Sequence, residues 1–457
     1  MKQNTTLTEG SIPKKIIAFA IPLFLGNLFQ QLYNMADSLI VGNYLGSSAL
    51  AAVTSTGSLI FLLVGFFNGT AMGAGVVISR YFGAKDYEKV KKAVHTDIAF
   101  GIAAGIVMMI LGVLFTPQIL IWMKTPDEVL AQAVSYLRIY FLGSLAVVLY
   151  NVCMGILQAV GDSKHPLYYL IFSSIVNVLL DLLFNGIFRL GVEYAALATI
   201  ISQMLSVVLC MRRLMKAQDV YQVKLQEIRF DMPLLRQIIA IGLPSGMQNS
   251  IISIANIVVQ SNINAFGKMA MAGCGSYSKI EGFGFMPITC FAMAMTTFIG
   301  QNLGAREYDR AKKGAVFGIL CSTVTAELIG IAIYLFIPEL VGLFDTEADV
   351  ISYGSLQAHT VALFYFLLAF SHTVAGIMRG AGKSTVPLVV MLICWCLIRI
   401  TYITVIVRFI PKIVMVFWAY PFTWTLSSIL FLVYLVKADW IHNFERQEKN
   451  NARRNGI

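Results

Sequence analysis

The sequence predicts an all-α polytopic membrane protein, with twelve transmembrane helices arranged as two parallel six-helix repeats. Three observations carry this prediction: the composition, the spacing of the apolar segments and an internal repeat. Hydrophobic residues make up 58% of the 457 residues and charged residues only 13%, whereas a soluble domain carries about 25% charged residues. A chain this apolar is expected to be embedded in lipid rather than folded as several soluble domains.

Apolar segments long enough to cross a bilayer, which takes about 20 residues, recur along the whole chain. We expect spans near residues 16–40, 49–79, 94–116, 129–159, 166–188, 194–210, 237–263, 270–299, 315–337, 350–378, 385–407 and 414–436. The first ten residues are polar and no signal-peptide cleavage site follows them. We therefore expect no removable signal peptide.

The distribution of lysine and arginine predicts the orientation in the membrane. If the N-terminus is inside, the two tails and the even-numbered connections hold 26 of the 34 basic residues. The odd-numbered connections hold Lys124, Arg189, Lys268, Arg408 and Lys412, and the spans hold Arg138, Lys279 and Arg399. We expect both termini to be cytoplasmic, in a bacterial plasma (inner) membrane. The formal charge of +10 then reflects this topology and gives no reason to expect nucleic-acid binding.

An internal repeat divides the chain into halves. GAKDYEKVKKA at 83–93 matches GAREYDRAKKG at 304–314, and LQAVGDSKHPL at 157–167 matches MRGAGKSTVPL at 378–388. The two matches share one offset, since 304 − 83 and 378 − 157 both equal 221. The interpretation is an N-terminal lobe over 1–210, a basic cytoplasmic linker over 211–236, and a C-terminal lobe with its tail over 237–457. Because each half has an even number of spans, the two should be parallel repeats with a cavity expected between them.

The first span carries a polar stripe. Asn27, Gln30, Asn34 and Asp37 follow one another at steps of three, four and three, so they share one face of a helix. A charged side chain at mid-bilayer costs about 2.5–3.5 kcal/mol on insertion scales. A stripe that only joins two helices needs no ionisable acid, so we interpret this face as the wall of a water-filled pathway.

The fifth span carries a second stripe, formed by Ser174, Asn177, Asp181 and Asn185. Asp181 stands in an apolar context, and the alternative reading is a carboxylate that caps or bridges to another helix. Tyr136 and Arg138 lie on the fourth span. Arg138 either neutralises one of the acids or extends to the membrane interface, and the sequence leaves both alternatives open.

The repeat provides an internal control on the acids. Asp37 corresponds to Val259, and Asp181 corresponds to Tyr402, so the second half keeps neither acid. If the fold required the acids, both copies should tend to keep them. Ion handling is therefore expected in the N-terminal half. Arg138, Lys279, Glu281 and Arg399 are interpreted as a structural charge network.

Enzyme and metal chemistry find little support. GKST at 382–385 lacks the glycine that a phosphate loop would need at position 377, which is isoleucine. No Ser/His/Asp or Cys/His arrangement has a recognisable spacing. All seven cysteines fall in apolar segments without a CxxC pair, so neither disulfides nor a zinc site is expected. We expect no enzyme, no cofactor and no metal centre, apart from Na⁺ as a candidate ligand of the acids.

These motifs together resemble the multidrug and toxic compound extrusion (MATE) family over essentially the whole chain. The resemblance rests on Pro22 with QQLYNMADSLIVG at 30–42, on NVLLD at 177–181, and on the repeated loop motifs. It implies a V-shaped bundle of two lobes that exports organic cations against inward H⁺ or Na⁺. Within the family, the acids resemble those of the DinF-like branch. The extra acids of the NorM-like branch are absent, so no Na⁺ site is expected in the C-terminal lobe.

The resemblance also implies roles for individual residues. Asp37, Asn177 and Asp181 would form the coupling-ion and substrate site. Tyr136 and Thr199 would line it, and Pro22 would bend the first helix. We expect a cation-coupled antiporter, with H⁺ before Na⁺ as the coupling ion, that acts as a monomer by alternating access. The alternative function is a flippase for a lipid-linked anionic substrate. A receptor or scaffold would not need two acid-bearing stripes.

Overall fold

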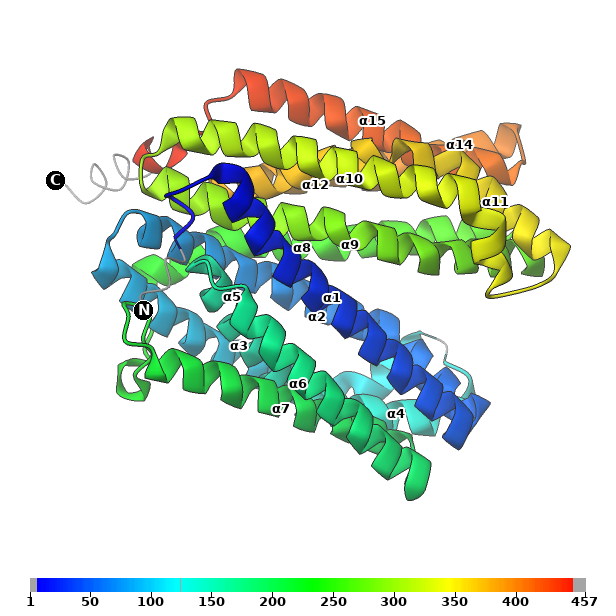
Figure 1. Ribbon diagram of the computed structural model, residues 1–457. Coiled ribbons are helices and arrows are strands. Elements are labelled where there is room, and N and C mark those ends of the chain that lie inside the picture. Colours follow the sequence, from blue (N-terminus) through cyan, green and yellow to red (C-terminus); the bar gives the residue numbers. More distant parts are fainter. Residues whose placement is uncertain (1–5, 124, 447–457) are drawn as a thin grey trace. The chain divides into compact units, whose positions relative to one another are not determined.

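The computed structural model describes residues 6–123 and 125–446, and every regular element in that part of the chain is a helix (Figure 1). The first half contains α1 (Ile12–Leu45), α2 (Ser47–Gly83), α3 (Tyr87–Trp122), α4 (Asp127–Leu142), α5 (Ser144–Ala159), α6 (Lys164–Asp181), the π-helical η1 (Leu182–Ile187) and α7 (Val192–Lys216). Lys124 and the chain ends, which entered the topology prediction, lie outside the described residues.

A short 3₁₀ turn, η2 (Leu225–Glu227), lies in the linker. The second half contains α8 (Met232–Asn264), α9 (Lys268–Gly304), α10 (Tyr308–Gly342), α11 (Ala348–Val361), the 3₁₀ turn η3 (Ala362–Phe364), α12 (Tyr365–Gly380), α13 (Thr385–Met391), the π-helical η4 (Leu392–Ile398), α14 (Arg399–Phe409) and α15 (Ile413–Lys437). Each predicted span coincides with one of these helices or with a pair or trio of consecutive ones. The all-α membrane fold class is confirmed.

Length and composition agree with membrane spans. Within the described residues, ten helices are long and apolar enough to cross a bilayer, and the bent pair α4 and α5 makes an eleventh candidate. α2, at 37 residues, stands where the second span was predicted. The spacing of apolar segments therefore located the spans correctly, because the thickness of the hydrocarbon layer sets a minimum helix length.

Several spans are interrupted, which the apolar pattern did not predict. α4 and α5 meet at a bend of 47°, and Gly143 stands between them. A Cβ at Gly143 would lie 2.2 Å from Ile200 of α7, so only glycine lets α7 pack this closely at the bend. The corresponding span of the second half is broken by η3. Two other spans contain π-helical segments, η1 and η4.

The internal repeat extends to backbone geometry. α2 and α9 have the same length, and each is followed by a residue other than glycine in the left-handed region: Lys85 with φ 57° and Arg306 with φ 60°. Gly161 and Gly382 also share positive φ values, 92° and 73°. Both pairs are related by the same offset as the sequence motifs. Similar residues at this offset therefore form the same turns.

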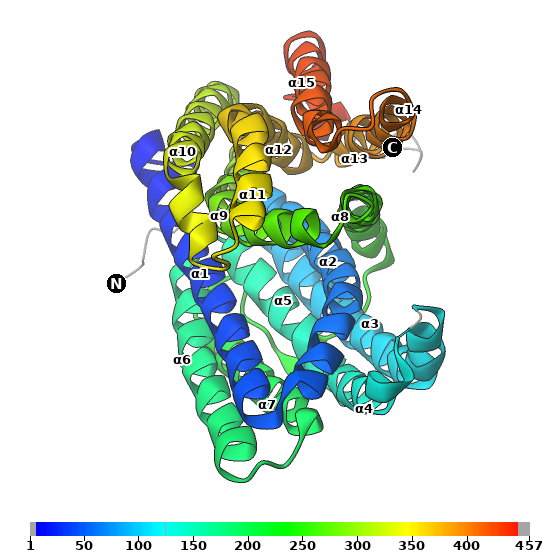
Figure 2. The ribbon, with the colours of Figure 1, turned by 90° about the vertical axis from the view of Figure 1, so that its right-hand side faces the viewer.

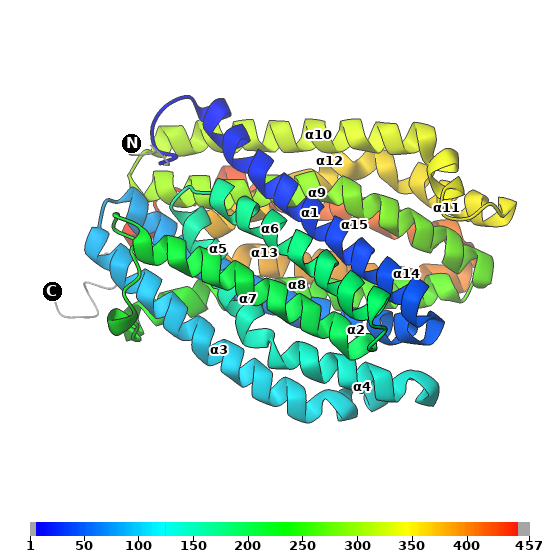
Figure 3. The ribbon, with the colours of Figure 1, turned by 60° about the horizontal axis from the view of Figure 1, so that its bottom comes forward.

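By their contacts the described residues form two compact units, one over Ile21–Gly246 and another that joins Leu7–Ala20 to the chain from Met247 onward. In the first unit, α5 packs against α2, α3 and α7, and Figure 2 shows it enclosed by its neighbours. α6 and α7 run side by side (Figure 3). In the second unit, α9 packs against α10, α11 and α12. The lobes 1–210 and 237–457 describe the sequence repeat and stay a prediction.

The start of the described chain is anchored within the second unit. The Leu7 N–H donates to Gln301 Oε1 at 2.9 Å, and the Arg310 guanidinium donates to the carbonyls of Leu7 and Gly10. From Ile21 onward, α1 belongs to the first unit. Pro22 stands beside this change of unit, inside a helix that runs without interruption from Ile12 to Leu45.

Candidate functional site

The two acids of the sequence stripes come together inside the first unit. Gly26 of α1 faces Leu170 of α6, and a Cβ at Gly26 would lie 3.7 Å from the Leu170 side chain. The two helices run side by side in the same direction (Figures 1 and 3). The step from Gly26 to Asp37 equals the step from Leu170 to Asp181, and each is about three helical turns. Equal spacing along parallel helices brings both acids to the same level.

The carboxyl groups of Asp37 and Asp181 are close enough to interact with one another. Asp181 is fully buried, and Asp37 is half-buried. Among the described residues, neither oxygen of Asp181 has a hydrogen-bond partner, and Asp37 Oδ1 has none. Two adjacent carboxylates that are shielded from water repel each other unless a proton or a cation is shared between them. The pair therefore suits the binding of a small positive ion.

Two asparagines extend this polar surface along the same helix face. Asn177 lies one turn before Asp181, and Asn185 lies one turn after it. Both side chains are buried, and within the described residues neither the oxygen nor the nitrogen of either amide has a partner. Asn185 lies in η1, which begins directly after Asp181. π-helical segments occur frequently at functional sites.

Tyrosines surround the acid pair. Tyr136 of α4 lies close enough to interact with both Asp37 and Asp181. Tyr33, one turn before Asp37 on α1, interacts with Gln30 and with Gln203 of α7. The sequence analysis did not include Tyr33 or Gln203. Tyr33 could have been found from its spacing, because a residue four positions before Asp37 lies on the same helix face. Nothing in the sequence pattern indicated Gln203.

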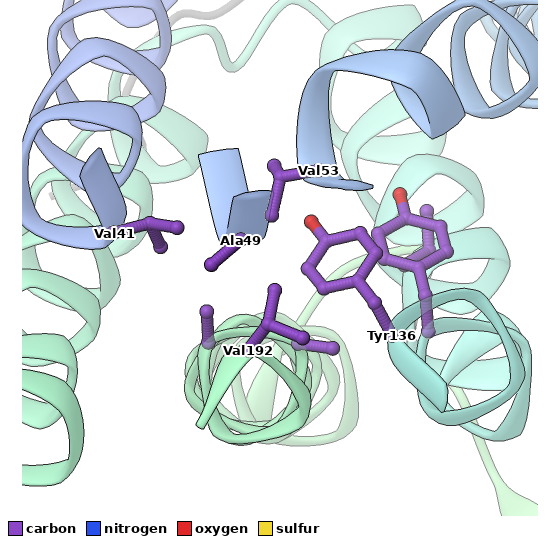
Figure 4. Close-up of a cluster of buried hydrophobic side chains, with 9 residues drawn as sticks. Val41, Ala49, Val53, Tyr136 and Val192 are labelled. Carbon is purple, nitrogen blue, oxygen red and sulfur yellow. The ribbon is translucent and has the colours of Figure 1, made fainter. Parts of the chain in front are cut away.

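An apolar cluster borders the site where α1 ends. It comprises Val41, Ala49, Val53, Tyr136, Tyr140, Val147, Val192, Ala195 and Ala196. Figure 4 shows Val41, Ala49, Val53 and Val192 gathered with Tyr136 around a shared centre. Val41 is one turn beyond Asp37, so the carboxyl group lies next to packed hydrocarbon. Electrostatic interactions are stronger in such low-dielectric surroundings than in water.

The other predicted lining residues differ in their exposure and in their hydrogen bonds. Asn27 is half-buried, whereas Gln30 and Asn34 are exposed. The Ser174 hydroxyl donates to the Leu170 carbonyl at 2.8 Å, and the Thr199 hydroxyl donates to the Ala195 carbonyl at 3.2 Å. Ser174 and Thr199 therefore satisfy their hydroxyl protons within their own helices, and their role at the site stays a prediction.

The residues predicted as a charge network have different environments. Arg399 is buried in the second unit, and its Nε and Nη2 atoms donate to the Thr423 hydroxyl at 3.1 and 2.9 Å. Its guanidinium lies 4.6 Å from the centre of the Tyr420 ring. Glu281 is close enough to interact with Arg399. Arg138 is exposed on α4.

Lys279 is also exposed, and its ammonium lies 5.4 Å from the centre of the Phe344 ring. One further acid, Asp97 of α3, was missed by the sequence analysis. Asp97 is buried, and neither of its oxygens has a hydrogen-bond partner among the described residues. It is a lone acid in an apolar span and belongs to no polar stripe, so the spacing of polar residues did not reveal it.

The family model MatE matches residues 22–183 and again residues 244–405. The probable multidrug resistance protein YoeA of Bacillus subtilis is 29% identical over 435 residues, covering 93% of this chain and 94% of that protein. The multidrug export protein MepA of Staphylococcus aureus is 25% identical, covering 82% of this chain and 83% of its own.

Among solved structures, the outward-facing conformation of a multidrug resistance MATE family transporter of the MOP superfamily has a TM-score of 0.89. It is 23% identical and covers 95% of this chain and 97% of its own. That similarity shows the fold. The family model matches two segments of equal length, one in each half, and together they cover well over half of the chain. The chain therefore belongs to the MatE family, whose members are transporters and not enzymes.

Proposed function

We propose that the protein is a cation-coupled antiporter that exports organic cations or drugs by alternating access. The single observation that carries the coupling mechanism is the interaction between Asp37 and Asp181 in a buried site with unpartnered polar atoms. The names of the relatives, multidrug resistance protein and multidrug export protein, support the substrate class. The DinF-like assignment and the cytoplasmic position of both termini remain parts of this proposal.

In this mechanism, the coupling ion and the cationic substrate compete for the same negative charge. With both acids ionised, the site attracts a positive group strongly, because charge repulsion between the carboxylates is relieved by the ligand. Entry of the coupling ion from outside neutralises the pair and releases the substrate. The Asn177 and Asn185 amides, one turn on either side of Asp181, offer both donors and acceptors to either species.

A proton is the proposed coupling ion, with Na⁺ as the alternative. One proton shared between two carboxyl groups removes their repulsion without further ligands. Na⁺ would need several oxygen ligands, and the oxygens of Asp37, Asn177, Asp181 and Asn185 are the ones on this surface. The residues present fit both ions, so the choice is made by experiment.

The test is efflux of ethidium from vesicles that contain purified protein. A pH gradient that is acidic on the side opposite the cytoplasmic face should drive export. Collapse of that gradient with a protonophore should stop it. Export driven by a Na⁺ gradient at constant pH would replace H⁺ with Na⁺ in the proposal. Export that responds to neither gradient would contradict antiport.

The flippase alternative requires several cationic side chains at one anionic-substrate site. Arg399 instead donates to Thr423 and lies against Tyr420, while Arg138 and Lys279 are exposed on other helices. Within the second unit, Arg399 is buried against its own partners and Lys279 is exposed, so these two cations stand in different surroundings. We therefore retain the organic-cation antiporter, acting as a monomer, as the proposed function.

A further inference from the structure

An acidic side chain lies in the middle of a membrane helix of the second unit and does not belong to the acid pair of the first unit. Glu327 stands near the midpoint of α10, which is 35 residues long. At the usual helical rise, each end of α10 is roughly 25 Å away from this side chain. A carboxyl group at this depth is costly to insert into a bilayer and usually marks a function or a polar partner.

One polar partner is present. Glu327 Oε2 accepts a hydrogen bond of 3.2 Å from the backbone N–H of Phe366. Phe366 is in the first turn of α12, which starts after the break at η3. A carboxylate at a helix N-terminus satisfies a free N–H group and interacts favourably with the helix dipole. Capping of α12 is therefore one reason for an acid at this position.

The sequence repeat shows that such a cap is not required by the fold. At the offset of the repeat, α12 corresponds to α5, and both begin after a break in a membrane span. Glu327 then corresponds to Ile106, and Phe366 to Leu145. The first unit forms an interrupted span of its own, bent by 47° between α4 and α5, with an isoleucine where the second has a glutamate. The acid of α10 is thus left with a role beyond capping.

Glu327 lines a groove of about 740 Å³ between α10, α12 and α15, a volume within the range of sites for drug-sized ligands. α12 packs against both α10 and α15 and so forms the floor of the groove. The surface is mainly apolar and includes Leu320 and Val324 of α10, Phe366 and Phe370 of α12, and Ile429 of α15.

Charge in this groove comes from one side chain. Of the described residues that line it, Glu327 alone is ionisable. The three hydroxyl groups of the lining donate to backbone carbonyls: Thr323 to Ile319 at 2.8 Å, Thr425 to Pro421 at 2.8 Å, and Ser428 to Leu367 at 3.1 Å. The groove therefore presents hydrocarbon and aromatic surface around a single carboxyl group.

We propose that this groove binds a membrane-dissolved, monovalent amphipathic cation, with its positive charge at Glu327 and its hydrocarbon body against α10, α12 and α15. Charge complementarity selects this occupant, because a lipid acyl chain would leave the carboxyl group against hydrocarbon. Phe366 and Phe370 also line the groove and offer aromatic rings to a cation. The ligand class rests on the proposed export of organic cations, and the site is separate from Asp37 and Asp181.

The test measures binding of radiolabelled tetraphenylphosphonium to the full-length protein in lipid nanodiscs by equilibrium dialysis. The double variant Asp37→Asn/Asp181→Asn removes the charge of the first site. In that background the groove should still bind one cation. Adding Glu327→Gln should weaken binding at least tenfold, because glutamine keeps an acceptor for the Phe366 N–H but has no charge. Glu339→Gln, an exposed carboxyl group on the same helix, is the matched control and should change nothing.

A second variant tests the groove without touching the carboxyl group. Leu320→Trp fills it from an exposed position and should also abolish binding, while uncharged triphenylphosphine oxide should not distinguish Glu327→Gln from its parent. Binding that survives Glu327→Gln or Leu320→Trp would overturn the proposal, as would loss of all binding in the Asp37→Asn/Asp181→Asn protein. The binding assay uses no ion gradient. If the protein is not an antiporter, the vesicle experiment fails while these binding results stay unchanged, so the two proposals are tested separately.

Discussion

Asp37 and Asp181 interact across two helices although they lie far apart in the sequence. Their contact follows from register, because each acid lies about three helical turns beyond the point where Gly26 of α1 faces Leu170 of α6. A Cβ at Gly26 would be in van der Waals contact with Leu170, so the two helices lie side by side at this point. The acids thus form a pair because two parallel helices pack closely three turns earlier.

A pair that acts as one unit should give non-additive mutational effects. Asp37→Asn and Asp181→Asn should each reduce gradient-driven export at least tenfold, and the double variant should lose little more than either single variant. Residues in direct contact couple in this way, whereas distant residues contribute independently. Initial rates of cation efflux from vesicles, normalised to protein content, measure the coupling. If the loss of export rate in the double variant equals the product of the two single losses, the acids work separately.

Pro22 stands inside α1, where proline supplies no N–H for a helical hydrogen bond and crowds the preceding turn, so we predict a bend at this point. Replacing Pro22 with alanine should straighten α1 and slow export severalfold while leaving membrane insertion intact. Pro244→Ala, the corresponding change in α8, is the control, because it restores a backbone N–H donor in a different helix. Export by Pro22→Ala at the wild-type rate would remove the bend from the mechanism.

Arg399 is predicted to stabilise the second unit through its contacts with Thr423 and Tyr420. Arg399→Leu should destabilise the protein by about 1.5–3 kcal/mol, the usual range for hydrogen bonds to charged groups. Arg399→Lys should not restore stability, because an ammonium cannot form the two-pronged contact and stack on the ring. Thermal melting in detergent measures both variants. Arg138→Leu, at an exposed site, should change little, and equal melting of Arg399→Leu and wild type would contradict this role.

The linker supplies a pH-dependent contact. A hydrogen bond from Lys91, 2.5 Å away, holds the pKa of Glu227 below its usual value of 4.5. The contact therefore stabilises the docked linker above that value and is lost as the pH falls through the lower folded-state pKa. A nitroxide label at exposed Gln218 should become more mobile in wild type as the pH falls through that lowered pKa.

Glu227→Gln is the control for that pH dependence. Its linker should have the same mobility on either side of the transition, apart from effects of other acids that both proteins share. The hydrogen bond from the Lys224 N–H to His95 Nε2, at 3.0 Å, remains in both. An identical acid response in the variant would exclude Glu227 as its source.

Much of the fold could be predicted because it depends on local sequence. The helices follow the apolar segments, and the turns at Lys85 and Arg306 recur with the same backbone geometry because their sequence motifs recur. The break at Gly143 could not be predicted in this way. It depends on Ile200, a residue of another helix that fills the space beside the glycine, and apolar periodicity carries no information about such a neighbour.

The sequence also predicted only part of the candidate site, because spacing describes one helix at a time. The spacing of Asn177, Asp181 and Asn185 placed them on one face, and the structure leaves the polar atoms of all three without protein partners in the described part of the chain. Helix spacing, however, relates residues only within one helix. Gln203 approaches Tyr33 from α7, and Glu327 lies alone in its span, so neither formed a pattern in the sequence.

The most direct test of the account is gradient-driven export by Asp37→Asn, measured beside wild type and Val259→Asn in vesicles with an imposed pH gradient. Asparagine keeps the size and hydrogen-bonding capacity of Asp37 but removes its charge. The account predicts that Asp37→Asn folds and inserts normally yet loses the gradient-dependent component of export. Val259→Asn, at the repeat-related position, should retain most of it. Robust gradient-dependent export by Asp37→Asn would contradict the coupling role of this residue.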